Sequence, residues 1–348
     1  MELSDFNKKL ARTFVKDFNL PTSVISEAHF FYMLHCLRYE HLWRFFVNTI
    51  NSFPGIFESQ ISQFFEERDR IHKEIIDSIV STPEYQEFNA CDMNKYKINH
   101  DIQVSKNKEY KYYVSIDLKN ANIQALHYAN PKITFTKDTW ENLVYKFNGF
   151  NAMSEYVIAS KHFRQVLFGM LNPKRTITVE KYIMSQIYDV IQKHIESLNE
   201  QFIDDIIETY TSGNTKSIDF DLVSFNNDEL VFGYNSSVYI DFNHVLKETG
   251  FDVHIKTYSK KEIRLRNLST YDLTQKFELV TYDDKTTKLK NVPGYLYAIV
   301  YQLARGRQIN NNHKHFMNDN MDCLIMDDFI LCDREGNEIT ETLIKDEI

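Results

Sequence analysis

The chain has 348 residues and a formal net charge of −9, with 43% hydrophobic and 14% aromatic residues. This length can bury a substantial core, and nine glycines and six prolines exclude a fibrous or low-complexity protein. No apolar run reaches the ~18 residues that span a bilayer, and the first residues lack a hydrophobic signal core. We therefore expect an intracellular globular protein, cytoplasmic or nuclear, with two or three lobes and no membrane partner.

The first hundred residues are predicted to be helical. Apolar residues recur with a 3.6-residue period over 30–50 and again over 58–80, where Ser81-Thr82-Pro83 ends the pattern. We expect residues 1–107 to form one helical region.

Residues 111–126 join a predicted strand to a predicted helix, with Asp117 at the junction. The run before Asp117 is β-branched and aromatic, and apolar residues at 118, 121, 125 and 126 follow at helical spacing. A carboxylate at the end of a core strand is held rigidly, as a metal ligand at a reaction centre must be. A helix N-cap is the structural alternative, because Asp is favoured there.

A second acidic position is predicted at the turn Asn226-Asn227-Asp228-Glu229. Short apolar runs flank it on both sides, so a hairpin would present Asp228 and Glu229 at its tip. Neighbouring carboxylates repel each other, and a divalent cation shared with Asp117 would stabilise the arrangement. Asp117, Asp228 and Glu229 are therefore the candidate catalytic residues.

A helix is predicted over residues 153–170, with an apolar stripe on one face. Its second face carries Lys161, Arg164, Gln165 and Phe168. Two cations and a ring on one strip can neutralise a triphosphate and stack on a base. The alternative is a solvated face with Phe168 in the core. Asn172-Pro173 ends the helix, and Lys174 and Arg175 add charge beside it.

The most basic local cluster lies between residues 256 and 266. Its members are Lys256, Lys260, Lys261, Arg264 and Arg266. The acidic net charge does not exclude nucleic-acid binding, because positive charge can be concentrated in one cleft. We expect this cluster to bind nucleic acid, with a solvated strand face as the alternative.

In chain order these segments resemble motifs A, B and C of the palm and fingers of family A DNA polymerases. The resemblance covers about residues 110–240. It consists of the strand-end Asp117, a basic helix ending in Phe168-Gly169, and Asn227-Asp228-Glu229-Leu230 where the family has His-Asp-Glu-Leu. Arg164 stands where the family has a phosphate-binding Lys, and the family's Arg falls on Ser160, one residue before Lys161.

Several positions depart from the family pattern. The family's Glu five residues after the motif A Asp is Asn122 here, and its fingers Tyr is Asn172. The alanine at the fourth position after Asp117, Ala121, is a feature in which the chain resembles reverse transcriptases.

A rival motif C occurs at Met326-Asp327-Asp328, which resembles the Met-Asp-Asp hairpin of reverse transcriptases. We place motif C at Asp228, because a predicted helix over 242–250 and a predicted strand over 251–258 would complete a palm-like unit after it.

The resemblance implies an α+β fold with the right-hand arrangement of polymerases. It implies a helical thumb-like region over 1–107, a ferredoxin-like palm with short helical fingers over 108–258, and a mixed C-terminal accessory lobe over 259–348. The implied activity is template-directed extension of a nucleic-acid 3′-hydroxyl, as in DNA replication, with a primer-template and dNTPs or NTPs as partners.

The resemblance also assigns roles. Asp117 and Asp228, aided by Glu229, would hold two Mg²⁺ ions, with Mn²⁺ as an alternative. The nucleotide-binding residues would be Lys161, Arg164, Phe168, Asn122, Lys174 and Arg175, with Phe168 packed on the base and Asn122 near the sugar. Two alternatives remain: a template-independent terminal transferase or inactive polymerase-like nucleic-acid-binding protein, and a protein-interaction module whose acids are structural.

Overall fold

The computed structural model describes residues 7–105, 108–133, 139–209, 220–235, 240–319 and 321–345, and it is an α+β protein. The N-terminal helices are α1 (Lys8–Asp17), α2 (Glu27–Leu37), α3 (Glu40–Asn51), α4 (Phe57–Val80), α5 (Pro83–Ala90) and the 3₁₀ helix η2 (Met93–Tyr96). The central helices are α6 (Ala121–Ala129), α7 (Trp140–Asn148), α8 (Ala152–Ala159), α9 (Lys161–Gly169), α10 (Pro173–Thr209) and α11 (Phe242–Lys247). The C-terminal helices are α12 (Gly294–Ala304) and α13 (Asn311–Lys314).

The strands are β1 (Tyr112–Leu118), β2 (Phe220–Phe225), β3 (Glu229–Tyr234), β4 (Val253–Asn267), β5 (Phe277–Tyr282), β6 (Thr287–Lys290), β7 (His315–Asn318), β8 (Met321–Leu324) and β9 (Phe329–Cys332). None of the helices in the described ranges carries an apolar stretch long enough to cross a lipid bilayer.

The N-terminal region is helical, as its sequence predicts. In α4 the buried residues recur at helical spacing, at Phe64, Ile71, Ile75 and Ile79. The next helix begins where Thr82 accepts a hydrogen bond from the backbone N–H of Tyr85 and Pro83 occupies the first turn. Proline is tolerated there because that position has no helical acceptor for an N–H.

Seven strands form one antiparallel sheet. Its order is β2-β3-β1-β4-β5-β6, and β9 pairs with the second half of β4. Helices α6 to α10 separate β1 from β2, and α11 separates β3 from β4. The chain from β1 to β4 therefore runs strand, helices, strand, strand, helix, strand, with β1 between β3 and β4.

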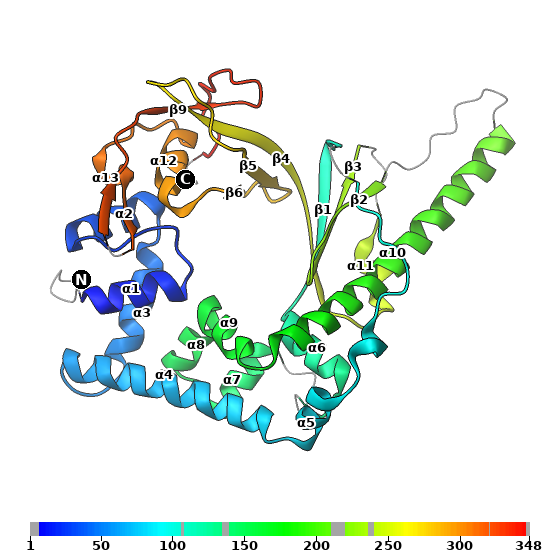
Figure 1. Ribbon diagram of the computed structural model, residues 1–348, viewed down its shortest axis with the longest axis horizontal. Coiled ribbons are helices and arrows are strands. Elements are labelled where there is room, and N and C mark those ends of the chain that lie inside the picture. Colours follow the sequence, from blue (N-terminus) through cyan, green and yellow to red (C-terminus); the bar gives the residue numbers. More distant parts are fainter. Residues whose placement is uncertain are drawn as a thin grey trace.

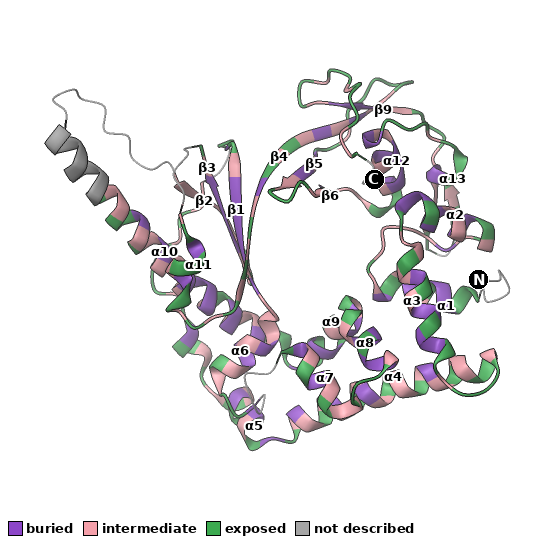
Figure 2. Ribbon diagram, turned by 180° about the vertical axis from the view of Figure 1, so that it is seen from behind, coloured by how far each residue is buried: buried purple, intermediate pink, exposed green. Residues whose placement is uncertain are grey.

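One face of the sheet is covered by helices and the other carries the polar site. Val114 and Ile116 of β1 pair with Phe232 and Leu230 of β3, and all four are buried in the core that includes α10. Figure 2 shows the buried positions that run along β1 and along α10 beside it. Alternate residues of a strand point to opposite faces, so Ser115 and Asp117 lie on the other face.

Two elements differ from the sequence-based expectation. The single helix predicted over 153–170 is wrong, because Ser160 is extended and separates α8 from α9. The Ser160 hydroxyl accepts a hydrogen bond from the backbone N–H of Phe163, which makes it the N-cap of the second helix. The strand predicted over 251–258 continues to Asn267, so the expected boundary between residues 258 and 259 falls inside β4.

The elements are arranged as a ring in which the two ends of the chain meet (Figure 1). The sheet and α10 lie on one side, α4 lies along the bottom, and the N-terminal helices meet the C-terminal elements on the other side. There Tyr32 of α2 hydrogen-bonds to His313 at 3.0 Å, and Gln302 of α12 donates to the Cys36 carbonyl at 3.3 Å. Met33, Leu37 and Ala298 form a small apolar cluster at the same contact.

Candidate active site

Asp117 lies inside β1 and does not cap the following helix. It pairs directly with Glu229 of β3 and His254 of β4, so it stands in the middle of the sheet. The N-cap position of α6 is occupied by Asn120, three residues further on, in the left-handed conformation with φ 46°. The N-cap alternative for Asp117 is therefore wrong, and no helix-capping bond explains this carboxylate.

The predicted hairpin is formed by β2 and β3. Asn226 donates its backbone N–H to the Glu229 carbonyl at 2.9 Å, and Asp228 lies exposed in the turn. The Asp228 carbonyl accepts the backbone N–H of Leu118 at 2.8 Å, which joins the turn to the end of β1. Glu229 is held from the other side, because the Ser115 hydroxyl donates to its carboxylate at 2.6 Å.

The three acids act on one another electrostatically. Burial raises the pKa of Asp117, and the negative charges of Asp228 and Glu229 raise it further. Lys256 and His254 oppose this effect from β4. The structure therefore brings together the two acidic motifs that lie more than a hundred positions apart in the sequence.

Glu180 of α10 is a fourth acid at this site, and the sequence reading did not identify it. Its side chain is 4% exposed, and the Asn122 amide donates to it at 2.6 Å. Burial and the charge of Asp228 raise the pKa of Glu180 to about 7. The signal was present in the sequence, because Glu180 falls on the stripe of α10 that also carries the buried residues Thr176 and Ile183.

Two carboxylates of this site, those of Asp117 and Asp228, could hold a magnesium ion only together with further ligands. Within the described ranges, no group of three or more His, Cys, Asp or Glu residues is arranged to bind a metal by itself. Mg²⁺ is commonly bound through one or two carboxylates together with waters and substrate phosphates. Asp117 and Asp228 supply two such carboxylates, and a cation would relieve the repulsion that raises the Asp117 pKa.

Helix α9 approaches this site through Arg164. Its guanidinium donates to the Asn120 side chain at 2.9 Å, at the start of α6. Lys161 is exposed in the first turn of α9. Phe168 is 5% exposed and packs against Trp140, with ring centroids 6.0 Å apart, so its ring is not available to a base in this structure.

The two cations after α9 have different surroundings. Lys174 is exposed. Arg175 instead donates to the backbone carbonyls of Phe88 and Cys91 at the end of α5. This arrangement explains Arg175 as a residue that joins α10 to α5.

The basic cluster of β4 is divided between two faces of the strand. Lys256, Lys260, Arg264 and Arg266 alternate on the face that carries Asp117, whereas Lys261 points the other way. Three of the five form ion pairs, Lys260 with Glu278 at 3.1 Å, Lys261 with Glu341 at 2.7 Å and Arg264 with Glu262 at 2.7 Å. Arg266 donates to the Gly336 carbonyl at 3.0 Å.

The rival acidic pair is not at the tip of a hairpin. Asp327 and Asp328 lie between β8 and β9, which belong to different sheets. The Asp328 carboxylate accepts a hydrogen bond from Lys314 at 2.5 Å. The arrangement of Asp228 between two paired strands is therefore not repeated there.

Comparison of the chain with protein-family models, curated proteins and solved structures finds no match.

Proposed function

We propose that the protein is a template-directed nucleotidyltransferase that extends a nucleic-acid 3′-hydroxyl. The observation that carries the proposal is the meeting of Asp117, Asp228 and Glu229 at the ends of the central strands β1 and β3, where burial and the charges of Asp228 and Glu229 raise the pKa of Asp117. The β-α-β-β-α-β order of connections around them supports a ferredoxin-like palm. In this proposal α1 to α5 form the thumb-like part and α7 to α9 form the fingers.

In the proposed reaction the 3′-oxygen of the primer attacks the α-phosphorus of a nucleoside triphosphate, and the bond from that phosphorus to the β-phosphate bridge breaks. Two Mg²⁺ ions held by Asp117, Asp228 and the phosphates would supply Lewis-acid stabilisation of the attacking and leaving oxygens. Glu229, oriented by Ser115, keeps further negative charge beside Asp117. Pyrophosphate leaves with the electron pair of the broken bond, and the proton of the 3′-hydroxyl is released to solvent.

The remaining residues bind and orient the nucleotide. Arg164 and Lys161 offer charge-assisted contacts to the triphosphate. Asn122, five residues after Asp117, lies near the sugar and is oriented by Glu180. A proton on Glu180 near neutral pH limits the negative charge beside Asp228.

Extension assays distinguish this proposal from its alternatives. The protein is incubated with a primer-template, Mg²⁺ and labelled dNTPs or NTPs, with Asp117→Asn as the control for contaminating activity. Extension that follows the template supports the proposal. Tailing without a template assigns a terminal transferase, and nucleic-acid binding without turnover assigns an inactive relative of such enzymes. If the protein shows no turnover and binds no nucleic acid, the remaining interpretation is a protein-interaction module.

A further inference from the structure

Three tyrosines from three neighbouring strands form a row on the face of the sheet that carries the acids. Tyr113 of β1 pairs with Tyr258 of β4, which pairs with Tyr282 of β5. The first two rings are stacked with centroids 5.5 Å apart, and the second and third are 5.8 Å apart. Tyr113 is four residues before Asp117, so alternation of the strand places both on one face.

A lysine lies over each of these rings. The Nζ atoms are 4.5 Å from the Tyr113 centroid for Lys260, 5.5 Å from the Tyr258 centroid for Lys290, and 5.8 Å from the Tyr282 centroid for Lys288. Attraction between the cation and the ring, together with contact of the aliphatic stem, orders these side chains. Lys256, which pairs with Ser115, extends the row toward Asp117. We refer to Lys256, Lys260, Lys288 and Lys290 as the lysine strip.

The lysine strip is positive in a protein whose net charge is −9. Lys260 is paired with Glu278. For Lys256, Lys288 and Lys290, no carboxylate among the described residues lies within ion-pair distance. Lys256 and Lys288 are exposed, and Lys260 and Lys290 are half-buried. The ammonium groups of Lys256, Lys288 and Lys290 are therefore available to an anion.

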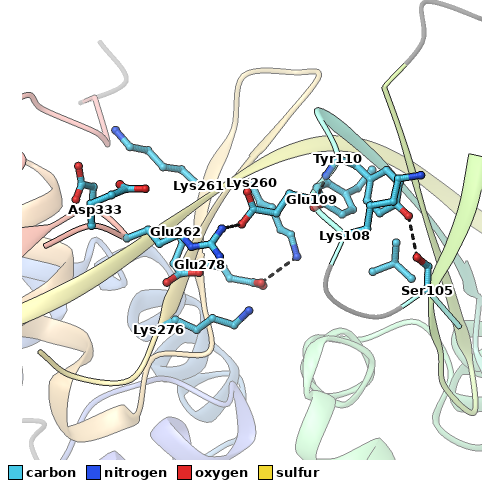
Figure 3. Close-up of a pocket in the computed structure, with 14 residues that line it drawn as sticks. Ser105, Lys108, Glu109, Tyr110, Lys260, Lys261, Glu262, Lys276, Glu278 and Asp333 are labelled. Carbon is cyan, nitrogen blue, oxygen red and sulfur yellow. Dashed lines mark hydrogen bonds and ion pairs between the residues drawn. The ribbon is translucent and has the colours of Figure 1, made fainter. Parts of the chain in front are cut away.

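A cavity of about 860 Å³ lies at the end of the lysine strip that is remote from Asp117. Figure 3 shows Lys260 and Lys276 around this cavity beside Glu262, Glu278 and Asp333, so its lining carries both signs of charge. Its wall is completed by the ion pair between Arg334 and Glu109. Residues two apart on a strand are separated by about 6.7 Å. The six residue steps from His254 to Lys260 therefore place Lys260 about 20 Å along β4 from the row of Asp117.

We propose that the lysine strip binds the phosphate backbone of a nucleic-acid strand that runs from the acidic site to this cavity. The rings of Tyr113 and Tyr258 are buried, at 2% and 7% exposed, and Tyr282 is half-buried, so the surface offers mainly charge to phosphates. Binding is therefore independent of base sequence. Lysines already ordered on rings lose less side-chain entropy on binding than free ones. That the 3′ end of this strand reacts at the acidic site rests on the proposed function, whereas the binding of the strand to the lysine strip does not.

The test uses the full chain and a fluorescent 30-nucleotide oligo-dT, without Mg²⁺ or nucleotide, over a series of salt concentrations. The double variant Lys288→Gln/Lys290→Gln touches none of the acids. Two lost phosphate contacts should lower the slope of log affinity against log salt by up to about 1.4 and weaken binding roughly tenfold at 0.1 M salt. The matched control is Lys193→Gln/Lys247→Gln, which removes the same charge from α10 and α11 on the other side of the sheet.

The outcomes separate the strip from the reaction. Weaker binding and a smaller salt slope in the first variant, with wild-type behaviour in the control, support the proposal. Equal loss in both variants, no loss in either, or no binding by the wild-type protein at low salt overturns it. Asp117→Asn is measured in parallel and should bind the oligonucleotide as the wild-type protein does. If the wild-type protein binds but does not extend a primer, the proposed reaction is overturned and the lysine strip remains supported.

Discussion

The Asn122 amide donates a hydrogen bond to the buried Glu180 carboxylate across 58 positions of sequence, with the two atoms 2.6 Å apart. This contact fixes the first turn of α6 against α10, directly beside the turn that carries Asp228. The contact therefore joins Asn122, which is proposed to face the sugar, to Glu180, whose pKa is raised by burial and by the charge of Asp228.

The two proposed metal ligands should be indispensable. Asp117→Asn and Asp228→Asn should each lower the extension rate by roughly three decades, about 4 kcal/mol, because the lost stabilisation occurs mainly in the transition state. Asp327→Asn, a control in the other acidic pair, should retain activity. Circular dichroism establishes that each variant folds. A strong loss in Asp327→Asn together with an active Asp228→Asn would move the site to the C-terminal lobe.

Glu180 should make stability depend on pH. Its folded pKa of about 7 lies above the ordinary 4.5, so the folded state holds the proton more tightly than the unfolded state. The resulting stabilisation is complete below pH 4.5 and is lost as pH rises through 7, by about 3 kcal/mol. Glu180→Gln should therefore unfold at a higher temperature than wild type at pH 8 but not at pH 5. A difference in melting temperature between the two proteins that stays constant from pH 5 to 8 would refute this.

The two arginines that the resemblance assigns to nucleotide binding, Arg164 and Arg175, should behave differently. Arg164→Ala should raise the nucleotide KM and lower kcat together, because a charge-assisted phosphate contact acts in both the ground state and the transition state. Arg175→Ala should leave nucleotide kinetics unchanged and lower the melting temperature, because its bonds go to backbone carbonyls of α5 and the following residue. Steady-state kinetics and thermal melts of both variants decide this, and identical profiles would contradict it.

Sugar selection should depend on Asn122. Its amide is a donor as well as an acceptor and is smaller than the Glu of the polymerase pattern, so rNTPs should be incorporated measurably beside dNTPs. Asn122→Phe should increase the preference for deoxyribose. The ratio of kcat/KM for the matched dNTP and rNTP is compared between the two proteins. Glu180→Ala, which removes the acceptor of the Asn122 amide, is the control for the lost hydrogen bond. An unchanged ratio in Asn122→Phe would place the sugar elsewhere.

The contact between α2 and α13 should loosen in acid. Burial lowers the pKa of His29 and of His313, and His29 also faces the ring of His315 and the charge of Asp322. The unfolded state then binds more protons, so the stabilisation is complete above pH 6.5 and is lost as pH falls through the folded values. Hydrogen exchange of α2 should accelerate at pH 5.5 relative to 7.5 after correction for the intrinsic rate. His29→Gln should reduce this difference, and exchange that is equally protected at both values would contradict the prediction.

Local patterns in the sequence were sufficient to predict several parts of this structure. The β-branched and aromatic run before Asp117 and the apolar runs around Asp228 predicted β1 and the hairpin, because such runs are typical of strands buried within a sheet. The break at Ser160 was missed because the apolar residues of α8 and α9 maintain one apparent stripe, although a Ser within a helix pattern is a known cap signal. The continuation of β4 was also readable, since apolar and charged residues alternate over Ile263-Arg264-Leu265-Arg266.

The convergence of the site could not be obtained from local pattern alone. The pairing of Asp117 with Glu229 and His254 depends on strand order, which no single segment encodes. The same is true of the bond from Arg164 to Asn120 and of the row of tyrosines, whose members come from three separate strands. For Phe168 the helical spacing was compatible with both a binding face and the core. Only the tertiary packing against Trp140 shows that it lies in the core.

The meeting of α2 with the C-terminal elements has a consequence for biosynthesis. Tyr32 and its partner His313 are 281 positions apart, and translation at about 5–20 residues per second separates their appearance by roughly 15 to 60 seconds. During that interval Met33 and Leu37 have no Ala298 to cover them. The nascent chain therefore exposes an apolar patch until its last quarter leaves the ribosome, and chaperone dependence of its folding should decrease when that patch is made polar.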